Sequence, residues 1–451
     1  MNECYKLNWT RKIETIDKMI CHLKSHNFSL YGKVKIIKQY LLSKIVFPAS
    51  LLKVPDTVIA DLTKKFFNFL WGKRDRVKRS TTIRKSINGG LAMIDLSSYL
   101  DSLKAAWVPR LLKIPGKWNA SFTNICNKLN ISLKYLINMT FKSITGIPVL
   151  KNMNDFNIEV LSSFNKCKDI KQFDLLSTNE ILRQPLWGNY YFKRENCLCF
   201  KQWTKAGMLY VKDLFDDNGN PLQDQILLDK IGAYPQMLSH LSIVKRYIVK
   251  KLGYEQYINA KYVNIKQNCI ILFENKLHCI VDKKSSFFYS ILKSKIEKRG
   301  NMETIYSRNF MFENSKVVWN SIYKQKLVSM FAPKMLEFNF KILHNIIPSG
   351  YVLSKWNKNI NSNCDICNTV ETTLHMLYEC QKIKKLWIIV SQCLGIDIKW
   401  KQIVIGFPLC DDSEKICIYN NVITIVAYCI FKDNMYCKYN DVKQSNTNIY
   451  I

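Results

Sequence analysis

The segment NSNCDICNTVETTLHMLYEC, residues 361–380, holds three cysteines and a histidine at the spacing C-x2-C-x7-H-x4-C. The candidate metal ligands are Cys364, Cys367, His375 and Cys380. A gap of two residues lets both thiolates of one tight turn point at a single ion, and the later histidine and cysteine, on a short helical segment beginning near Glu371, complete a tetrahedron. Four protein ligands leave no open coordination position. The pattern therefore predicts one structural Zn²⁺ ion and no catalytic metal.

The alternative is that these four residues are unrelated and simply buried. A lone Cys-x2-Cys pair would leave that alternative open, but here the histidine and the fourth ligand follow within range, and turn-forming residues 361–363 precede the first cysteine. The chain has 16 cysteines in all, spread from Cys4 to Cys437. In a chain of this length we expect most of the others to be buried thiols of a reducing compartment and not a disulfide framework.

The apolar residues on both sides of this segment follow a helical pattern. Upstream, residues 318–327 and 335–346 repeat apolar side chains at three- and four-residue spacing. Near the N-terminus the same spacing predicts helices over residues 9–24, 33–45 and 58–71, and Gly72 stops the third. Downstream, a final helix used only for packing is predicted from an apolar stripe made of Ile418, Val422, Ile425, Val426, Cys429 and Ile430.

The middle of the chain, residues 118–300, has a mixed pattern. Residues 270–273 predict a short strand, residues 240–250 a helix, and residues 216–221 a turn. We therefore expect a mainly α protein with a mixed α+β connector and a C-terminal helical CCHC zinc-binding module. The predicted domains are a helical domain over 1–117, the connector over 118–300, the zinc module over 301–400, and a helix and tail over 401–451.

The charge balance points to a polyanionic partner. The chain carries 67 Lys+Arg against 35 Asp+Glu, a formal net charge of +32. Such an excess repels itself and is most readily tolerated when nucleic acid is the normal partner. An anionic membrane is the second candidate, but it usually requires a basic amphipathic helix or a lipid anchor, and the sequence shows neither. Without a signal-peptide pattern or about 18 uninterrupted apolar residues, we expect an intracellular protein of the nucleus or cytoplasm and no membrane partner.

The basic residues are concentrated after the third helix. Between Lys64 and Lys85 the chain has nine basic residues and one acid, Asp75. A solvated surface is the ordinary interpretation of such a run, but in a chain of this charge, next to helices that carry Phe and Trp, we favour a surface that contacts phosphates. Gly89 and Gly90, just beyond, indicate a tight turn. The predicted nucleic-acid-binding residues are Lys33, Lys35, Lys73, Arg74, Arg76, Lys78, Arg79, Arg84 and Lys85.

The sequence lacks recognisable catalytic groups. A polymerase holds paired Mg²⁺ ions with two carboxylates. Phe215-Asp216-Asp217 has the right composition, but it runs into a turn-forming stretch, Asn218 to Pro221, and not into a strand, so we expect a surface turn. The motifs GxSxG, HExxH and the P-loop are absent. We predict no catalytic residue and no enzyme activity for this chain.

Several short motifs, in order along the chain, are similar to those of one family. They look like segments beyond the palm of non-LTR (LINE-type) retrotransposon reverse transcriptases: thumb, connector and C-terminal zinc-binding domain. The resemblance runs from about residue 8 to 430 and includes the CCHC set and Trp387. The motifs are SLYGKVKIIK (29–38), FLWGK (69–73), GGLAM (89–93), PLWGN (185–189), WTKAG (203–207), VKDL (211–214) and FKILHNIIP (340–348).

The resemblance implies a C-terminal fragment of such an enzyme, with residues 1–117 as its helical thumb. It implies binding of template RNA, primer duplex or target DNA, and of other retroelement proteins, while the fingers, palm and endonuclease are missing. Two alternatives stay open. The chain is a truncated retroelement copy without a selected role, or it is an accessory subunit that completes a polymerase supplied by another chain.

Overall fold

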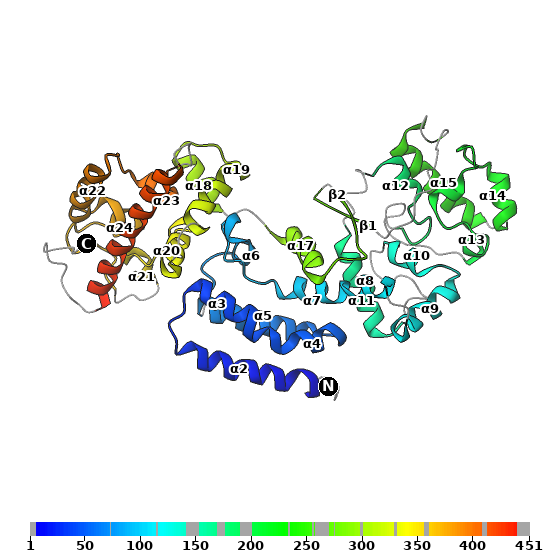
Figure 1. Cartoon of the computed structure of the whole chain (residues 1–451), viewed down its shortest axis with the longest axis horizontal. Coiled ribbons are helices and arrows are strands. Elements are labelled where there is room, and N and C mark those ends of the chain that lie inside the picture. The colour runs from blue at the N-terminus through cyan, green and yellow to red at the C-terminus, as the bar shows by residue number, and fades with distance from the viewer. Residues whose placement is uncertain are drawn as a thin grey trace. The chain divides into compact units, whose positions relative to one another are not determined.

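The computed structural model describes residues 6–72, 74–113, 116–140, 153–168, 176–189, 201–232, 235–254, 257, 270–274, 276–297, 301–328, 332–355, 360–407 and 413–439. Over these residues the protein is mainly helical, which confirms the predicted fold class (Figure 1). The chain divides into two compact units. Unit 1 consists of Met1–Ile45, Ala60–Asp95 and Ile296–Ile451, and unit 2 consists of Val46–Ile59 and Leu96–Lys295.

The N-terminal part of unit 1 confirms the helices predicted from apolar spacing. The π-helical turn η1 (Lys6–Thr10) leads into α2 (Arg11–Lys24), which buries Ile16 and Ile20. Helix α3 (Leu30–Ile36) starts at Ser29, whose hydroxyl accepts the Gly32 N–H as an N-cap. It continues as η2 (Ile37–Leu41). The long helix α5 (Asp56–Trp71) ends at Gly72, as predicted, in a left-handed conformation with φ +84°.

The C-terminal part of unit 1 is a series of helices that pack on the N-terminal ones. The backbone N–H of Leu30, at the start of α3, donates to Glu337 Oε2 at 2.9 Å, and the Trp71 and Phe340 rings lie 6.3 Å apart. Two short elements of the segment Ala60–Asp95, α6 (Arg79–Ile83) and η3 (Ser86–Asn88), are also part of unit 1. The series is α18 (Asn301–Asn309), α19 (Lys316–Tyr323), η8 (Lys324–Val328), α20 (Pro333–Leu343), α21 (Gly350–Ser354), η9 (His375–Glu379), α22 (Gln381–Leu394), α23 (Trp400–Ile405) and α24 (Ser413–Tyr439).

The buried face of helix α24 coincides only in part with the predicted one: Val426 and Ile430 are buried as predicted, whereas Ile425 is 41% exposed. By length and composition alone, Glu414–Lys438 is apolar enough to cross a membrane, and one third of its apolar window, including Ile423, Ala427 and Ile430, is buried within unit 1. Ile418, predicted to pack, is 57% exposed. The helix also buries polar side chains. The buried residues Asn420, Thr424 and Asn434 have hydrogen-bond partners in Phe407, Asn339 and Glu371, respectively.

Unit 2 is built around two tryptophans from the motifs PLWGN (185–189) and WTKAG (203–207). The Trp187 and Trp203 rings, both 1% exposed, lie 4.3 Å apart, and Trp187 Nε1 donates to Met208 O at 2.7 Å. The predicted strand at 270–273 is confirmed as β1 (Ile270–Phe273), which pairs antiparallel with β2 (Lys276–Cys279). The predicted helix at 240–250 lies within α15 (Pro235–Leu252). The other described helices are α4 (Ser43–Leu51), most of which lies in unit 2, α7 (Leu96–Ala105), α8 (Trp107–Lys113), α9 (Lys117–Leu129), α10 (Leu133–Asn138), α11 (Asp155–Cys167), α12 (Thr178–Leu182), α13 (Lys201–Lys205), η7 (Val211–Leu214), α14 (Asp224–Ile231) and α17 (Ser285–Ile296).

Candidate metal centre

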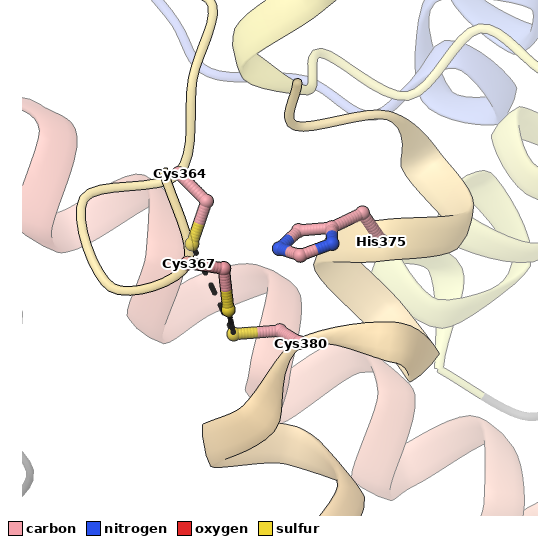
Figure 2. A group of neighbouring side chains, drawn as sticks. All are labelled: Cys364, Cys367, His375 and Cys380. Atoms are coloured by element: carbon pink, nitrogen blue, oxygen red, sulfur yellow. Dashed lines mark hydrogen bonds between the residues drawn. The ribbon is translucent and has the colours of Figure 1, made fainter. Parts of the chain in front are cut away.

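A tight turn in unit 1 presents the first two cysteines of the CCHC set. The Cys364 N–H donates to Thr369 O at 2.8 Å, and the Asn368 N–H donates back to Cys364 O at 2.9 Å. Asn368 closes the turn with φ +54°, a left-handed conformation that asparagine adopts more easily than most residues. A bridge between Asn363 and Val370 joins the two ends. The turn therefore directs the thiols of Cys364 and Cys367 to the same side (Figure 2).

The other two candidate ligands come from the helical segment that follows. His375 opens the π-helical turn η9, and the Cys380 N–H donates to His375 O at 2.9 Å, a bond that spans five residues. This wider turn brings both side chains to the turn of the first two cysteines (Figure 2). Cys380 is also the residue that precedes α22, so its sulfur lies at the positive end of a helix.

The four side chains have the geometry of a single tetrahedral site. Their ligand atoms all lie within 4.8 Å of one another. Cys380 Sγ is 3.9 Å from Cys364 Sγ and 3.7 Å from Cys367 Sγ. Two thiolates on one zinc ion at about 2.3 Å are about 3.8 Å apart, so the cluster fits that ion. His375 Nε2 is buried and has no hydrogen-bond partner among the described residues, which makes it the ligand atom on the histidine.

The environment of Cys380 disfavours its charged form. Burial raises the pKa of Cys380 to about 12, and the neighbouring thiols of Cys364 and Cys367 add to the effect. The backbone N–H of Lys382 opposes it, because it donates to the Cys380 sulfur. A thiolate in this environment needs a positive charge beside it, and a divalent metal ion supplies that charge.

Comparison with known proteins agrees with this geometry. Residues 301–387 match a family model described as zinc-binding in reverse transcriptase. This stretch is therefore similar to the zinc-binding region of reverse transcriptases. All four residues of the cluster lie inside it, as does Trp387, whose buried Nε1 donates to Leu377 O at 2.8 Å across the helix pair η9–α22. A comparison with curated proteins gives no match.

A buried carboxylate that the sequence analysis did not single out links the metal centre to the last helix. Glu371, 2% exposed, lies between Cys367 and His375. Its Oε1 accepts from the Gly350 N–H at 2.8 Å and from Lys438 Nζ at 2.5 Å, and its Oε2 accepts from Asn434 Nδ2 at 3.3 Å. Its backbone N–H donates to Ser362 O. Glu371 therefore fixes α21, the cysteine turn and α24 to one another.

We expect Glu371→Gln to lower the free energy of unfolding by about 2–3 kcal/mol, because the substitution leaves the largely buried Lys438 ammonium without its carboxylate. Urea unfolding of the zinc-loaded protein measures this. The matched control is Asp397→Asn, which removes the carboxylate of an exposed pair with Lys399 and should cost about 0–1 kcal/mol. Equal losses in the two variants would contradict the role given to Glu371.

The predicted phosphate-contacting residues that the structure describes all belong to unit 1, but they do not share one environment. Lys33 is half-buried, with its ammonium 5.9 Å from the centre of the Phe69 ring, and burial lowers its pKa. Arg79 is exposed and lies over the Phe67 ring while it pairs with Asp75 at 2.7 Å. Lys73 lies outside the described residues. The other predicted phosphate-contacting residues that are exposed are Lys35, Arg74, Arg76, Lys78 and Lys85.

Arg84 departs from the prediction. Its side chain is buried, and its Nη1 pairs with Glu303 Oε1 at 2.6 Å. The Tyr323 hydroxyl donates to the same carboxylate oxygen at 2.9 Å. A guanidinium neutralised in the interior does not contact a phosphate at the surface, so Arg84 holds the structure of unit 1 together.

The predicted turn at Asp216 is confirmed. The Asp216 carboxylate accepts the Asn220 N–H at 2.8 Å. This hydrogen bond, together with weaker ones from the backbone of Asn218 and Gly219, lowers the pKa of the carboxyl. Gly219 occupies the left-handed region with φ +88°. The carboxylate of Asp216 therefore closes a surface turn, as its sequence context predicts.

Proposed function

We propose that this chain is a nucleic-acid-binding, C-terminal part of a reverse transcriptase of the non-LTR retrotransposon type. The observation that carries the proposal is the zinc-binding region of the reverse-transcriptase type at residues 301–387. Unit 1 joins that region to the basic segment, which we define as the exposed residues Arg74, Arg76, Lys78, Arg79 and Lys85. Template RNA, a primer duplex or target DNA supplies the phosphates that such a segment binds.

In this proposal the metal is a single structural Zn²⁺ ion held by Cys364, Cys367, His375 and Cys380. Four protein ligands, three of them largely buried, leave no coordination position for a substrate. The ion would fix the cysteine turn against α22 and so stabilise unit 1. In this proposal the chain binds nucleic acid but does not catalyse DNA synthesis, and it acts inside the cell. The use of the Asp216 carboxylate in a turn supports this assignment.

Binding to duplex DNA, RNA and an RNA–DNA hybrid across a salt series tests the proposal. For the wild-type chain we expect a steep linear fall of log affinity with log salt. Replacing the five residues of the basic segment with alanine should flatten the slope on duplex DNA by roughly 0.9 for each phosphate that the variant no longer neutralises.

The control replaces five exposed lysines of unit 2, so that the net charge changes equally. The control positions are Lys128, Lys205, Lys230, Lys276 and Lys284. A slope that falls equally in both variants would show that net charge alone attracts the nucleic acid. A wild-type chain that does not bind at about 0.15 M salt would refute the proposed function.

A further inference from the structure

The basic segment is followed by a turn whose shape only glycine permits. After α6 the chain turns through η3 to Gly89, which has φ +79°, and then to Gly90. A Cβ on Gly90 would lie 2.1 Å from Arg84 O, so no larger residue fits. The chain then returns along α6, because the Leu91 and Met93 N–H groups both donate to Thr82 O at 3.1 Å. Lys78, Arg79 and Lys85 are carried by this closed loop.

Two side chains from residues 301–387, Tyr323 and His344, contact the loop at Gly89. The Tyr323 ring covers Gly89 so closely that a Cβ there would lie 2.3 Å from Cζ. His344 Nε2 lies 2.7 Å from Gly89 O. Since a carbonyl oxygen only accepts, Nε2 carries the proton, and burial lowers the pKa of His344 to about 4, so the ring is neutral at pH 7.

The third contact is the buried ion pair inside the loop. Glu303 Oε1 accepts hydrogen bonds from both Arg84 and the Tyr323 hydroxyl. The same carboxylate therefore fixes Arg84, which lies in the loop, and Tyr323, whose ring covers Gly89. At the start of the loop, Lys78 Nζ lies 3.4 Å from Oδ1 of Asn301, a residue that precedes Glu303 by two positions. Three buried side chains 200 or more residues away in sequence thus set the position of the loop.

We infer that Glu303, Tyr323 and His344 are positioning residues for nucleic-acid binding, which hold Lys78, Arg79 and Lys85 as a preformed surface for a phosphate backbone. This inference rests on the proposed function. A loop that is ordered before binding loses less conformational freedom when it meets the phosphates, so more of its charges act together. None of the three buried side chains touches the nucleic acid.

The first test is Gly89→Ala, whose new methyl group collides with the Tyr323 ring. We expect roughly tenfold weaker binding to duplex DNA and a salt slope that is smaller by about 1 to 2. The zinc content should stay at one per chain. The control is Gly207→Ala in unit 2, where φ is +77° but nothing lies within 4 Å of the added Cβ. It introduces the same backbone strain and should leave the salt slope unchanged.

A second pair of variants keeps the test decisive if Gly89→Ala does not fold. His344→Gln retains a donor for Gly89 O and should bind as the wild type does, whereas His344→Leu removes the donor and should reduce the salt slope as Gly89→Ala does. If the wild type binds with a steep slope and the Gly89 and His344 variants keep that slope, the inference is wrong and the proposed function stands. If the wild type does not bind, both fail together.

Discussion

Replacing Cys364 and Cys367 with serine is expected to unfold the cysteine turn, η9 and the start of α22, and to abolish stoichiometric zinc binding. These elements meet at the metal centre, where His375 Nε2 has no other partner among the described residues and Cys380 is buried. In small zinc modules the ion supplies on the order of 10 kcal/mol of folding free energy. Here part of the destabilisation should extend to α24, because Glu371 joins the centre to Lys438 and Asn434.

Metal analysis and circular dichroism during a chelator titration measure this effect. Wild-type protein should contain one zinc ion per chain and lose helix signal as the chelator removes it. The control is Cys393→Ser, a substitution at an exposed cysteine of α22 outside the cluster, which should behave as the wild type does. A metal-free chain with the same unfolding midpoint as the loaded one would show that the cluster is not a structural site.

The second large effect concerns a lysine inside unit 1. Lys326, on η8, is 2% exposed, and its ammonium donates to Ile403 O at 3.0 Å and lies 3.4 Å from Thr424 Oγ1. Among the described residues no carboxylate offsets the burial of this ammonium. Burial lowers its pKa from 10.5 to about 7. The folded chain therefore binds fewer protons than the unfolded chain between about pH 7 and 10, so the free energy of unfolding rises with pH in that window.

Lys326→Met should remove this rise. The difference in the free energy of unfolding between wild type and variant should change by about 2 kcal/mol between pH 7 and 9, with the wild type gaining, because the slope approaches about 1.4 kcal/mol per pH unit only above the folded-state pKa. Urea unfolding at the two pH values measures it, and other titrating groups cancel in the difference. Lys384→Met, at an exposed position of α22, is the control and should follow the wild type. Parallel pH profiles for wild type and Lys326→Met would contradict the assignment.

Features encoded by neighbouring residues could be predicted from the sequence. The helix over 58–71 depends on apolar spacing and a glycine stop, and both are local. The ligand set is also local, because Cys364 to Cys380 spans one turn and one helical segment. The same holds for the turn at Asp216, where the carboxylate binds a backbone N–H four residues away.

Features that depend on distant partners could not be predicted. Arg84 looks like the other basic residues near it until Glu303 is placed beside it, 219 residues away. Lys326 resembles a surface residue because a sequence does not show which helices will cover it. Trp187 and Trp203 belong to two separate sequence motifs, and only the fold shows that their rings meet in the core of unit 2.

The pairing of Arg84 with Glu303 has a consequence for synthesis of the chain. A ribosome adds about 5–20 residues per second, so Glu303 emerges roughly 10 to 40 seconds after Arg84. All of residues 96–295, most of unit 2, are made in that interval. Until then the loop that carries Lys78, Arg79 and Lys85 lacks both the Glu303 carboxylate and the Tyr323 ring that covers Gly89. We therefore expect the contacts that hold this loop to form only after residues 96–295 have left the ribosome.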